Sequence, residues 1–379
     1  HFLEHMMFNG SSKYPNKNEA VLIAEDYGLY QNAWTYYDST SYLVSGISKY
    51  KKIASEMLND RVTDPLLRTE DIEYEKLIIT EEIDWGNDDP GRKLWRNLTT
   101  VLYKNTQLEH DVIGTKKSIN GFTRKMVVDY KKRLYSPSNI VFVTAGDMTM
   151  KESIEIAKSA FPENVKGKAN RRSAIKPIKS RTKKIHFEKK NDLDQSLVSL
   201  AFHCEGLDGK NIYPIAILAQ ILDGGKSGVL NREITIEKGL TTAIGMAVML
   251  LADTGAVVIE AEFDNDKAGK LFKELKKELE KAKNGKIAKQ DFDRAKSSAL
   301  ASYEYMYEAS VPFIDFDSFA HRELVTGREF NPDEEIEKLN AVTFDEVVEA
   351  ANEIFNFNTY SASIIGKDEK VKEKLLIDF

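Results

Sequence analysis

The sequence predicts an α+β protein made of two domains of similar fold, each with a mixed or antiparallel sheet that carries helices on one face. Three observations support this class. Strand-like and helix-like patterns follow one another in mixed runs, which is typical of α+β domains. A stretch rich in Lys and Arg divides the 379 residues near their middle. The order of patterns after this stretch resembles the order before it, which indicates a duplicated plan.

The first half opens with a helical pattern over residues 1–7. No N-cap residue precedes it, although the first N–H groups of a helix need partners, so we expect a piece trimmed from a longer protein. A second helix is predicted over 18–27, because Gly28 stands where glycine commonly follows a helix. The other predicted elements are two strand segments within 32–47, a helix over 49–59, a longer helix from Thr69 to about 85, further helices up to 134, a strand over 140–145 and a helix ending near 161.

The second half repeats this plan. Its closing strand pattern, over 359–365, matches the strand pattern over 140–145 in type and position. The other predicted elements are strands over 196–202, 242–250 and 256–263, and helices over 213–222, 268–282 and 290–309.

A basic stretch supplies the best domain boundary. Nine Lys or Arg residues stand between 166 and 184, with few large apolar residues among them. Such a composition indicates a solvated linker far more often than a nucleic-acid patch. We therefore predict a first domain over 1–170, a basic linker over 171–185, and a second domain over 186–379 that does not bind metal.

Composition excludes several classes of protein. The formal net charge of −6 gives no electrostatic case for nucleic-acid binding, which needs a clustered excess of Lys and Arg. Cys204 is the one cysteine, so an internal disulfide and a thiolate metal cluster are both excluded. No apolar run approaches 18 residues, so we predict no membrane span. The compartment, cytoplasmic or periplasmic, stays open.

The chain begins with the pattern H-x-x-E-H, formed by His1, Glu4 and His5. Histidines four apart lie on one face of a helix, about one turn from each other, which suits two imidazoles that share one zinc ion. The intervening Glu4 can reach a metal-bound water and take its proton. The alternative without a function is a charged helix face with two solvated histidines. The apolar neighbours of the motif disfavour that alternative, and we predict a zinc site.

A catalytic zinc site needs a third protein ligand and one open position. The other four histidines are scattered, so a carboxylate on the helix from Thr69 is the natural third ligand. Glu75 and Glu82 are seven apart and share a face of that helix. Spacing alone does not choose Glu82 over Glu81, and an exposed acidic helix face explains the pattern equally well. The carboxylates of this helix are Glu73, Glu75, Glu81 and Glu82.

The opening residues, HFLEHMMFNG, resemble the zinc helix of the pitrilysin and insulin-degrading-enzyme peptidases, an inverzincin family that includes the mitochondrial processing peptidases and bacterial members. In that family a ligand Glu follows the motif by about 75 to 77 residues, and a supporting Glu precedes it by seven. The stretch EKLIITEEI, which holds Glu75 and Glu82, resembles that part of the family. The resemblance implies zinc ligands His1, His5 and Glu82, with Glu4 and Glu75 as catalytic residues.

The resemblance extends over most of the chain and is strongest over residues 1–150. The residues Asn32, Ala33, Trp34 and Thr35 are similar to the family's N-A-x-T strand, an edge where a peptide substrate docks as an added strand. Tyr135-Ser-Pro-Ser-Asn139 through Asp147 also fits the family. The family fold implies two similar α+β domains of the mitochondrial-processing-peptidase type.

Two departures from the family pattern bear on completeness. The strands that normally precede the zinc helix are absent from this sequence. The family also uses an Arg/Tyr pair around a G-L-x-Y segment to grip the substrate, and here Thr235 and Thr242 occupy the matching places beside Lys238-Gly-Leu-Thr-Thr. Threonine cannot make the bidentate hydrogen bonds of arginine. We therefore expect this chain to be the N-terminal, zinc-bearing half of a larger active enzyme, with a second homologous half as its partner.

Two other features look functional at first sight. Asp223-Gly-Gly-Lys-Ser-Gly228 resembles a phosphate loop, but Gln220 stands where a Walker A motif needs glycine, and a helix precedes it instead of a strand. It is better interpreted as a helix end and a turn. His110 is interpreted as a loop histidine with a structural role, and not as a fourth metal ligand.

We therefore expect a zinc-dependent endopeptidase that hydrolyses unfolded peptides, with Glu4 as general base. One alternative is a non-catalytic peptide-binding or scaffold subunit of the same fold, although such a subunit need not keep all of His1, Glu4, His5 and Glu82. Another is a metal-dependent hydrolase with a non-peptide substrate, which the similarity of the edge strand disfavours.

Overall fold

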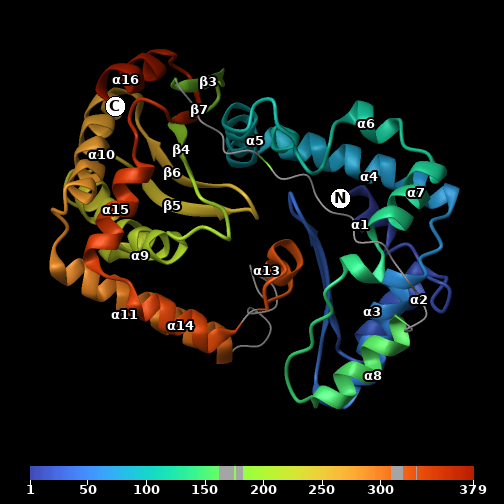
Figure 1. The fold of residues 1–379 in the computed structure, drawn as a ribbon. Helices are drawn as coiled ribbons and strands as arrows, with labels where there is room; N and C mark the ends of the chain where they lie inside the picture. Colours follow the sequence, from blue (N-terminus) through green and yellow to red (C-terminus); the bar gives the residue numbers. More distant parts are fainter. Residues whose placement is uncertain (162–174, 176–181, 309–318, 330) are drawn as a thin grey trace. The chain divides into compact units, whose positions relative to one another are not determined.

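The structure is a computed structural model that describes residues 1–161, 175, 182–308, 319–329 and 331–379 (Figure 1). The chain forms two compact units, each assembled from three stretches of sequence. Both units combine helices with strands, so the α+β class predicted from the sequence is confirmed. Unit 1 consists of His1–Trp85, Asp111–Ser173 and Glu308–Phe330, and unit 2 of Gly86–His110, Ala174–Tyr307 and Asn331–Phe379.

Unit 1 contains a two-stranded antiparallel hairpin and a set of helices. Strand β1 (Tyr30–Thr35) pairs with β2 (Thr40–Ser45), and the last residue of β1, Thr35, lies opposite Thr40. The helices are α1 (Phe2–Met6), α2 (Lys17–Asp26), α3 (Lys51–Thr63), α4 (Thr69–Asp88, whose last residues belong to unit 2), α6 (Lys116–Asn120), α7 (Arg124–Leu134), α8 (Met150–Ala160) and α13 (Phe319–Thr326), with 3-10 turns at Ser48–Tyr50 and Pro137–Asn139.

Local capping chemistry explains where several of these helices begin. Asn16 caps α2 by accepting hydrogen bonds from the N–H groups of Asn18 and Glu19, and Gly28 adopts the left-handed φ of 60° just after its end. At α8, Thr149 and Glu152 form a reciprocal capping box. These are the local signals that make helix positions in this unit predictable.

A late segment of the chain completes unit 1. His321 on α13 forms a 2.8 Å hydrogen bond between its Nε2 atom and Oδ1 of Asp38, in the turn that joins β1 to β2. The His321 ring also meets the ring of Tyr36 edge-on, with centroids 6.2 Å apart. Both side chains of the hydrogen bond are largely buried. The hairpin is therefore anchored by a helix almost 300 residues downstream.

Unit 2 is built on a five-stranded mixed sheet in the order β3-β7-β4-β6-β5. Strand β3 is parallel to β7, and the remaining neighbours are antiparallel. The strands are β3 (Lys184–Lys189), β4 (Ser196–Cys204), β5 (Ala243–Leu250), β6 (Gly255–Phe263) and β7 (Ser361–Gly366). The helices are α5 (Pro90–Leu102), α9 (Ile212–Asp223), α10 (Ala268–Lys283), α11 (Lys289–Glu308), α14 (Pro332–Ala341), α15 (Phe344–Ile354) and α16 (Lys370–Asp378), with 3-10 turns at Gln107–Glu109, Gly225–Ser227 and Asn265–Lys267 and a π-helical turn at Asn231–Ile236.

The two faces of this sheet are buried in different ways. On β4 the large side chains Val198, Leu200 and Phe202 share one face and join a core with residues of α9, α10 and α15. The alternating positions Ser199 and Ala201 are small and fully buried. Helix α5 packs against β3, β4 and β7, and its buried leucines are outside the α9–α10–α15 core. The alternation of side chains along β4 therefore places α5 on the face that carries Ser199 and Ala201. The sequence predicts helices on one face of the sheet, and α5 adds a helix on the other face.

Most predicted elements are present within one to three residues, but the strand predicted over 140–145 is wrong. That segment forms no strand in the part of the chain that the structure describes, where the sheet of unit 1 consists of β1 and β2. An apolar, β-branched run becomes a strand only beside a hydrogen-bonding neighbour. Conversely, β3 was not predicted. The linker predicted over 171–185 lies largely outside the described residues, so the boundaries at 170 and 186 stay predictions.

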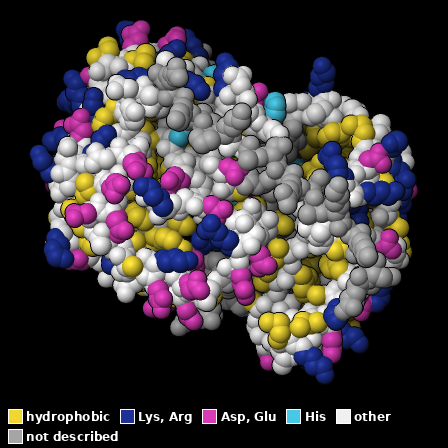
Figure 2. Space-filling model, in the orientation of Figure 1, with side chains coloured by type: hydrophobic (Ala, Val, Ile, Leu, Met, Phe, Trp, Pro, Cys, Tyr) yellow, Lys and Arg dark blue, Asp and Glu magenta, His cyan; other side chains and the backbone are white. Residues whose placement is uncertain are grey.

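Figure 2 shows Lys and Arg side chains interspersed with Asp and Glu side chains over the visible face. Within the described residues, no helix is both long enough and apolar enough to cross a bilayer.

The core of unit 1 generates a stability prediction at α4. Ile79 is fully buried, whereas Leu77 on the same helix is 64% exposed. We expect Ile79→Ala to lower the free energy of unfolding by about 2–5 kcal/mol, through lost burial and the cavity left behind. Leu77→Ala is the matched control and is expected to change it by about 0.5 kcal/mol or less. Urea unfolding measures both, and equal effects would contradict the assigned packing.

Candidate metal centre

Helix α1 has a polar face and an apolar face, and burial of the apolar face sets the position of the polar side chains. His1, Glu4 and His5 are half-buried and lie within one turn of each other on one face. The other face packs into the core of unit 1, where the ring of Phe2 meets that of Phe122 edge-on at 5.1 Å. The buried side chains of this region are Phe2, Leu3, Met6 and Met7.

Helix α4 supplies both the support and the carboxylates. Ile72, Ile79 and Ile83 form a buried stripe that belongs to the same core as the apolar face of α1. Glu75 and Glu82 each stand three residues after one of these isoleucines, so they flank the stripe on one side. The packing of α1 on α4 therefore brings carboxylates and imidazoles together.

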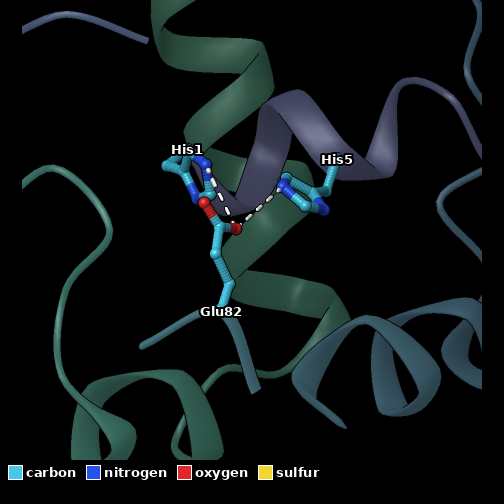
Figure 3. A group of neighbouring side chains, drawn as sticks. All are labelled: His1, His5 and Glu82. Atoms are coloured by element: carbon cyan, nitrogen blue, oxygen red, sulfur yellow. Dashed lines mark ion pairs between the residues drawn. The ribbon is translucent and has the colours of Figure 1, made fainter. Parts of the chain in front are cut away.

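One atom each from His1, His5 and Glu82 lies within 4.8 Å of the others. Oε2 of Glu82 is 3.8 Å from Nε2 of His1 and 3.7 Å from Nε2 of His5. In Figure 3 the Glu82 carboxylate points between the two imidazole rings. These distances are too long for hydrogen bonds, so the three groups converge on a shared space without bonding to each other.

The donor set fits a zinc ion. Two imidazole nitrogens and one carboxylate oxygen are a set found in catalytic zinc sites, where a fourth position stays open. Ligands about 2.0–2.2 Å from a tetrahedral ion are about 3.3–3.6 Å apart, close to the two distances found here. The Nδ1 atom of His1 is buried without a hydrogen-bond partner among the described residues. His1 is thus less firmly oriented than His5.

Glu75 orients His5. Its Oε2 atom is 2.9 Å from Nδ1 of His5, and its side chain is only 3% exposed. Burial by itself would raise the pKa of Glu75, but hydrogen bonds from His5 and Asn9 and the charge of Lys17 bring it below the usual value. An ionised carboxylate only accepts hydrogen bonds, so Nδ1 of His5 carries the proton. The lone pair of Nε2 is then directed towards Glu82 and available to a metal.

A polar bracket around Glu75, formed by Asn9, Lys17 and Arg68, was not predicted from the sequence. Nδ2 of Asn9 donates to Oε1 of Glu75 at 2.9 Å and to the carbonyl of His5 at 3.1 Å. Nζ of Lys17 lies 3.1 Å from Oδ1 of Asn9 and 3.5 Å from Glu75, and Arg68 donates to the carbonyl of Asn9 at 2.8 Å. No spacing rule connects these residues. The one local signal was a polar side chain, Asn9, directly after the apolar run Met6-Met7-Phe8.

The predicted general base, Glu4, has a different partner. Oγ1 of Thr35 donates a hydrogen bond of 2.5 Å to Oε2 of Glu4. Glu4 therefore lies beside the end of β1, on the same face of α1 as the two histidines. The structure brings Glu4, His1, His5, Glu75 and Glu82 into one region of unit 1.

The four residues predicted to bind peptide are not equivalent. Asn32 is exposed, and its side chain accepts a 2.9 Å hydrogen bond from the N–H of Ala33 and donates to the hydroxyl of Tyr30 at 3.0 Å. Trp34 is half-buried and lies opposite Ser41 on β2. Of Asn32, Ala33, Trp34 and Thr35, the described contacts link Thr35 alone to the centre.

The remaining sequence candidates lie elsewhere. Glu81 is exposed and outside the convergent group, and Glu73 forms an ion pair of 2.7 Å with Lys76. Of these two neighbours, Glu82 is the one that the structure places beside His1 and His5. The side chain of His110 is 78% exposed and in unit 2. The loop after Asp223 follows the end of α9, as expected for a helix end and turn.

Two family models match successive parts of the chain. Residues 1–116 match the family described as insulinase, peptidase family M16, and residues 121–299 match the peptidase M16 inactive domain. The chain belongs to peptidase family M16. The convergent residues His1, His5 and Glu82, together with Glu4 and Glu75, all lie in the first of the two matched segments.

Individual M16 relatives span nearly all of the chain. An uncharacterized zinc protease of Rickettsia felis is 28% identical over 97% of this chain and 87% of its own length. The uncharacterized zinc protease YmxG of Bacillus subtilis is 24% identical over 96% of this chain and 87% of its own length. The mitochondrial-processing peptidase subunit beta of Saccharomyces cerevisiae is 23% identical over 93% of this chain and 78% of its own length.

Solved structures agree in fold. A protease from Helicobacter pylori superimposes with a TM-score of 0.86 at 22% identity and covers 96% of this chain and 88% of its own. A peptidase M16 inactive domain from Pseudomonas fluorescens gives a TM-score of 0.85 at 18% identity, over 97% of this chain and 88% of its own. At these identities the likeness shows the M16 fold.

The bracket around Glu75 generates a prediction for Asn9. Asn9→Ala removes a donor from a buried carboxylate and a partner from Lys17, so we expect the free energy of unfolding to fall by about 1–3 kcal/mol. Asn18→Ala is the matched control, because Asn18 is exposed and its side chain makes no described hydrogen bond. Urea unfolding at neutral pH provides the measurement. A loss no larger than that of the control would contradict the bracket.

Proposed function

We propose that this chain is the zinc-bearing half of a metalloendopeptidase that hydrolyses extended, unfolded peptides. The observation that carries the proposal is the convergence of His1, His5 and Glu82 within 4.8 Å of one another, with Glu4 on the same face of α1. The names of the relatives, several of them zinc proteases, support the same class of reaction.

The residues divide the chemistry between them. His1, His5 and Glu82 would hold zinc, which when bound lowers the pKa of a water molecule to about 7 and polarises a carbonyl group. Glu75 keeps the Nδ1 proton of His5 in place, so that Nε2 stays a ligand. Glu4 takes the proton of the attacking water at its carboxylate and delivers it to the leaving amine.

Strand β1 is the proposed docking site for the peptide. It is paired on one side with β2, and no other described strand pairs with it. A free strand edge binds an extended peptide through main-chain hydrogen bonds and rejects folded chains. The residues proposed to contact the peptide are Asn32, Ala33, Trp34 and Thr35.

A second homologous half is the proposed partner of this chain. In this chain Thr235 and Thr242 stand where the family resemblance places arginine and tyrosine. The hydroxyl of Thr235 lies 2.7 Å from that of Thr241, and the hydroxyl of Thr242 bonds to Gln195 at 3.2 Å. Neither side chain has the reach or the donors of arginine. A second homologous half would supply those groups.

A non-catalytic peptide-binding or scaffold subunit is the second candidate function. The match of residues 121–299 to a domain described as inactive favours it. That match does not include His1, Glu4, His5, Glu75 or Glu82, which all belong to the other matched segment. The two candidates differ in whether the zinc-loaded protein turns over peptide.

The role of Glu4 generates the central prediction. Glu4→Gln keeps the shape of the side chain and removes the base, so we expect kcat for an extended fluorogenic peptide to fall at least about 100-fold. Zinc content should stay unchanged, because Glu4 is not one of the convergent ligands. The assay uses the full-length gene product loaded with zinc.

Glu81→Gln is the control for this experiment, because Glu81 is exposed and outside the centre. Peptide hydrolysis retained by Glu4→Gln would reject Glu4 as base. A wild-type protein that binds zinc and peptide but cleaves nothing would favour the scaffold subunit.

A separate prediction concerns zinc affinity. Glu75→Gln leaves the size of the side chain unchanged but removes the charge that orients His5, so we expect zinc to bind about 10- to 100-fold more weakly. Competition with a chromophoric chelator measures the dissociation constant. Glu73→Gln changes an exposed carboxylate on the same helix and should match the wild type. Unchanged affinity in Glu75→Gln would show that Glu75 does not support the ligand.

A further inference from the structure

Thr35 connects the hairpin of unit 1 with the candidate base. Its hydroxyl lies 2.5 Å from Oε2 of Glu4, and the two residues are 31 positions apart in the sequence. Such a separation lies in the range of strong hydroxyl–carboxylate hydrogen bonds. A carboxylate only accepts hydrogen bonds, so the hydroxyl of Thr35 is the donor. The contact therefore holds Oε2 of Glu4 and leaves Oε1 without a described hydrogen bond.

The contact is also selective. Within the described residues, Thr35 is the one side chain that hydrogen-bonds to Glu4, and Glu4 forms no ion pair there. The Glu4 side chain is long and unbranched, and its described hydrogen bond to Thr35 sets the direction of its carboxylate. Threonine is suited to the task, because its branched Cβ restricts χ1 and holds the hydroxyl in few orientations.

We propose that Thr35 is a positioning residue that aligns the carboxylate of Glu4, and that its side chain does not serve peptide binding. This inference rests on the proposed function. It revises the role expected for Thr35 from its place in the predicted docking strand. The side chain of Thr35 is engaged with Glu4, which leaves its backbone for the peptide.

Thr35 also couples peptide docking to the alignment of the base. Thr35 is the last residue of β1, the strand proposed to receive the peptide. Addition of a peptide strand stiffens the edge it joins, and here the stiffened edge ends in the residue that holds the base. Correct docking and alignment of Glu4 are therefore linked through one side chain.

The test compares three variants of the zinc-loaded, full-length gene product. Thr35→Val keeps the branched shape and removes the donor, so kcat should fall about 10- to 100-fold while KM stays close to the wild-type value. Thr35→Ser restores the donor and should recover most of kcat. Thr40→Val changes a threonine directly opposite on β2 and should leave kcat near the wild-type value.

Two further readouts separate positioning from general damage. Thr35→Val should keep the zinc affinity of the wild type, because no described hydrogen bond joins the Thr35 side chain to His1, His5 or Glu82. In a Glu4→Gln background, Thr35→Val should cause no additional loss of kcat. A raised KM with unchanged kcat in Thr35→Val, or a Ser variant as impaired as the Val variant, would overturn the proposal.

The link between Thr35 and Glu4 can fail or survive independently of the peptidase activity. A wild-type protein without turnover would remove the proposed function, and a double-mutant cycle with Thr35→Val and Glu4→Ala then tests the contact through urea unfolding midpoints. Shifts smaller in combination than in sum would support the contact. Strictly additive shifts would overturn it.

Discussion

The packing of α1 against α4 is the contact on which the rest of the centre depends. Five residues form too few backbone hydrogen bonds to make a helix stable by itself, so α1 relies on its buried side chains. Met6 is fully buried in a core that also contains Ile72 and Ile79 of α4. Each such side chain contributes about 1.5–3 kcal/mol through burial. Helix α4 also carries Glu75 and Glu82. The packing that stabilises α1 against α4 therefore also sets the distances from these carboxylates to the imidazoles of the motif.

The buried carboxylate of Glu75 orients the imidazole of His5. An ionised carboxylate removed from water is costly unless its lone pairs are satisfied, and Glu75 meets this demand with His5, Asn9 and Lys17. The hydrogen bond from His5 that helps to satisfy the Glu75 carboxylate therefore also fixes the tautomer of His5. His1 has no such partner on its Nδ1 atom among the described residues. The two imidazoles of the motif are thus unequal, and the ring of His5 is the more firmly oriented of the two.

Local patterns made part of this arrangement predictable. Side-chain direction within a helix follows from sequence separation. The spacing of His1, Glu4 and His5 therefore predicts that they share one helix face, and the seven-residue interval predicts the same for Glu75 and Glu82. The bracket at Asn9 and the contact of Thr35 with Glu4 join elements far apart in the sequence, and no periodicity encodes them. The wrong strand over 140–145 and the missed β3 have the same origin. A strand is defined by its neighbour, and β3 pairs with a strand more than 170 residues later.

The anchoring of the hairpin by α13 has a consequence for the order of synthesis. His321 and Asp38 are 283 residues apart, and both belong to unit 1. At about 5–20 residues per second, a ribosome needs roughly 15–60 s to bring the second of these residues into existence after the first. During that interval the turn beyond Thr35 lacks its anchor. The unit that holds the candidate centre is therefore not an early, self-contained product of translation, and its hairpin acquires its final support only when most of unit 2 has emerged.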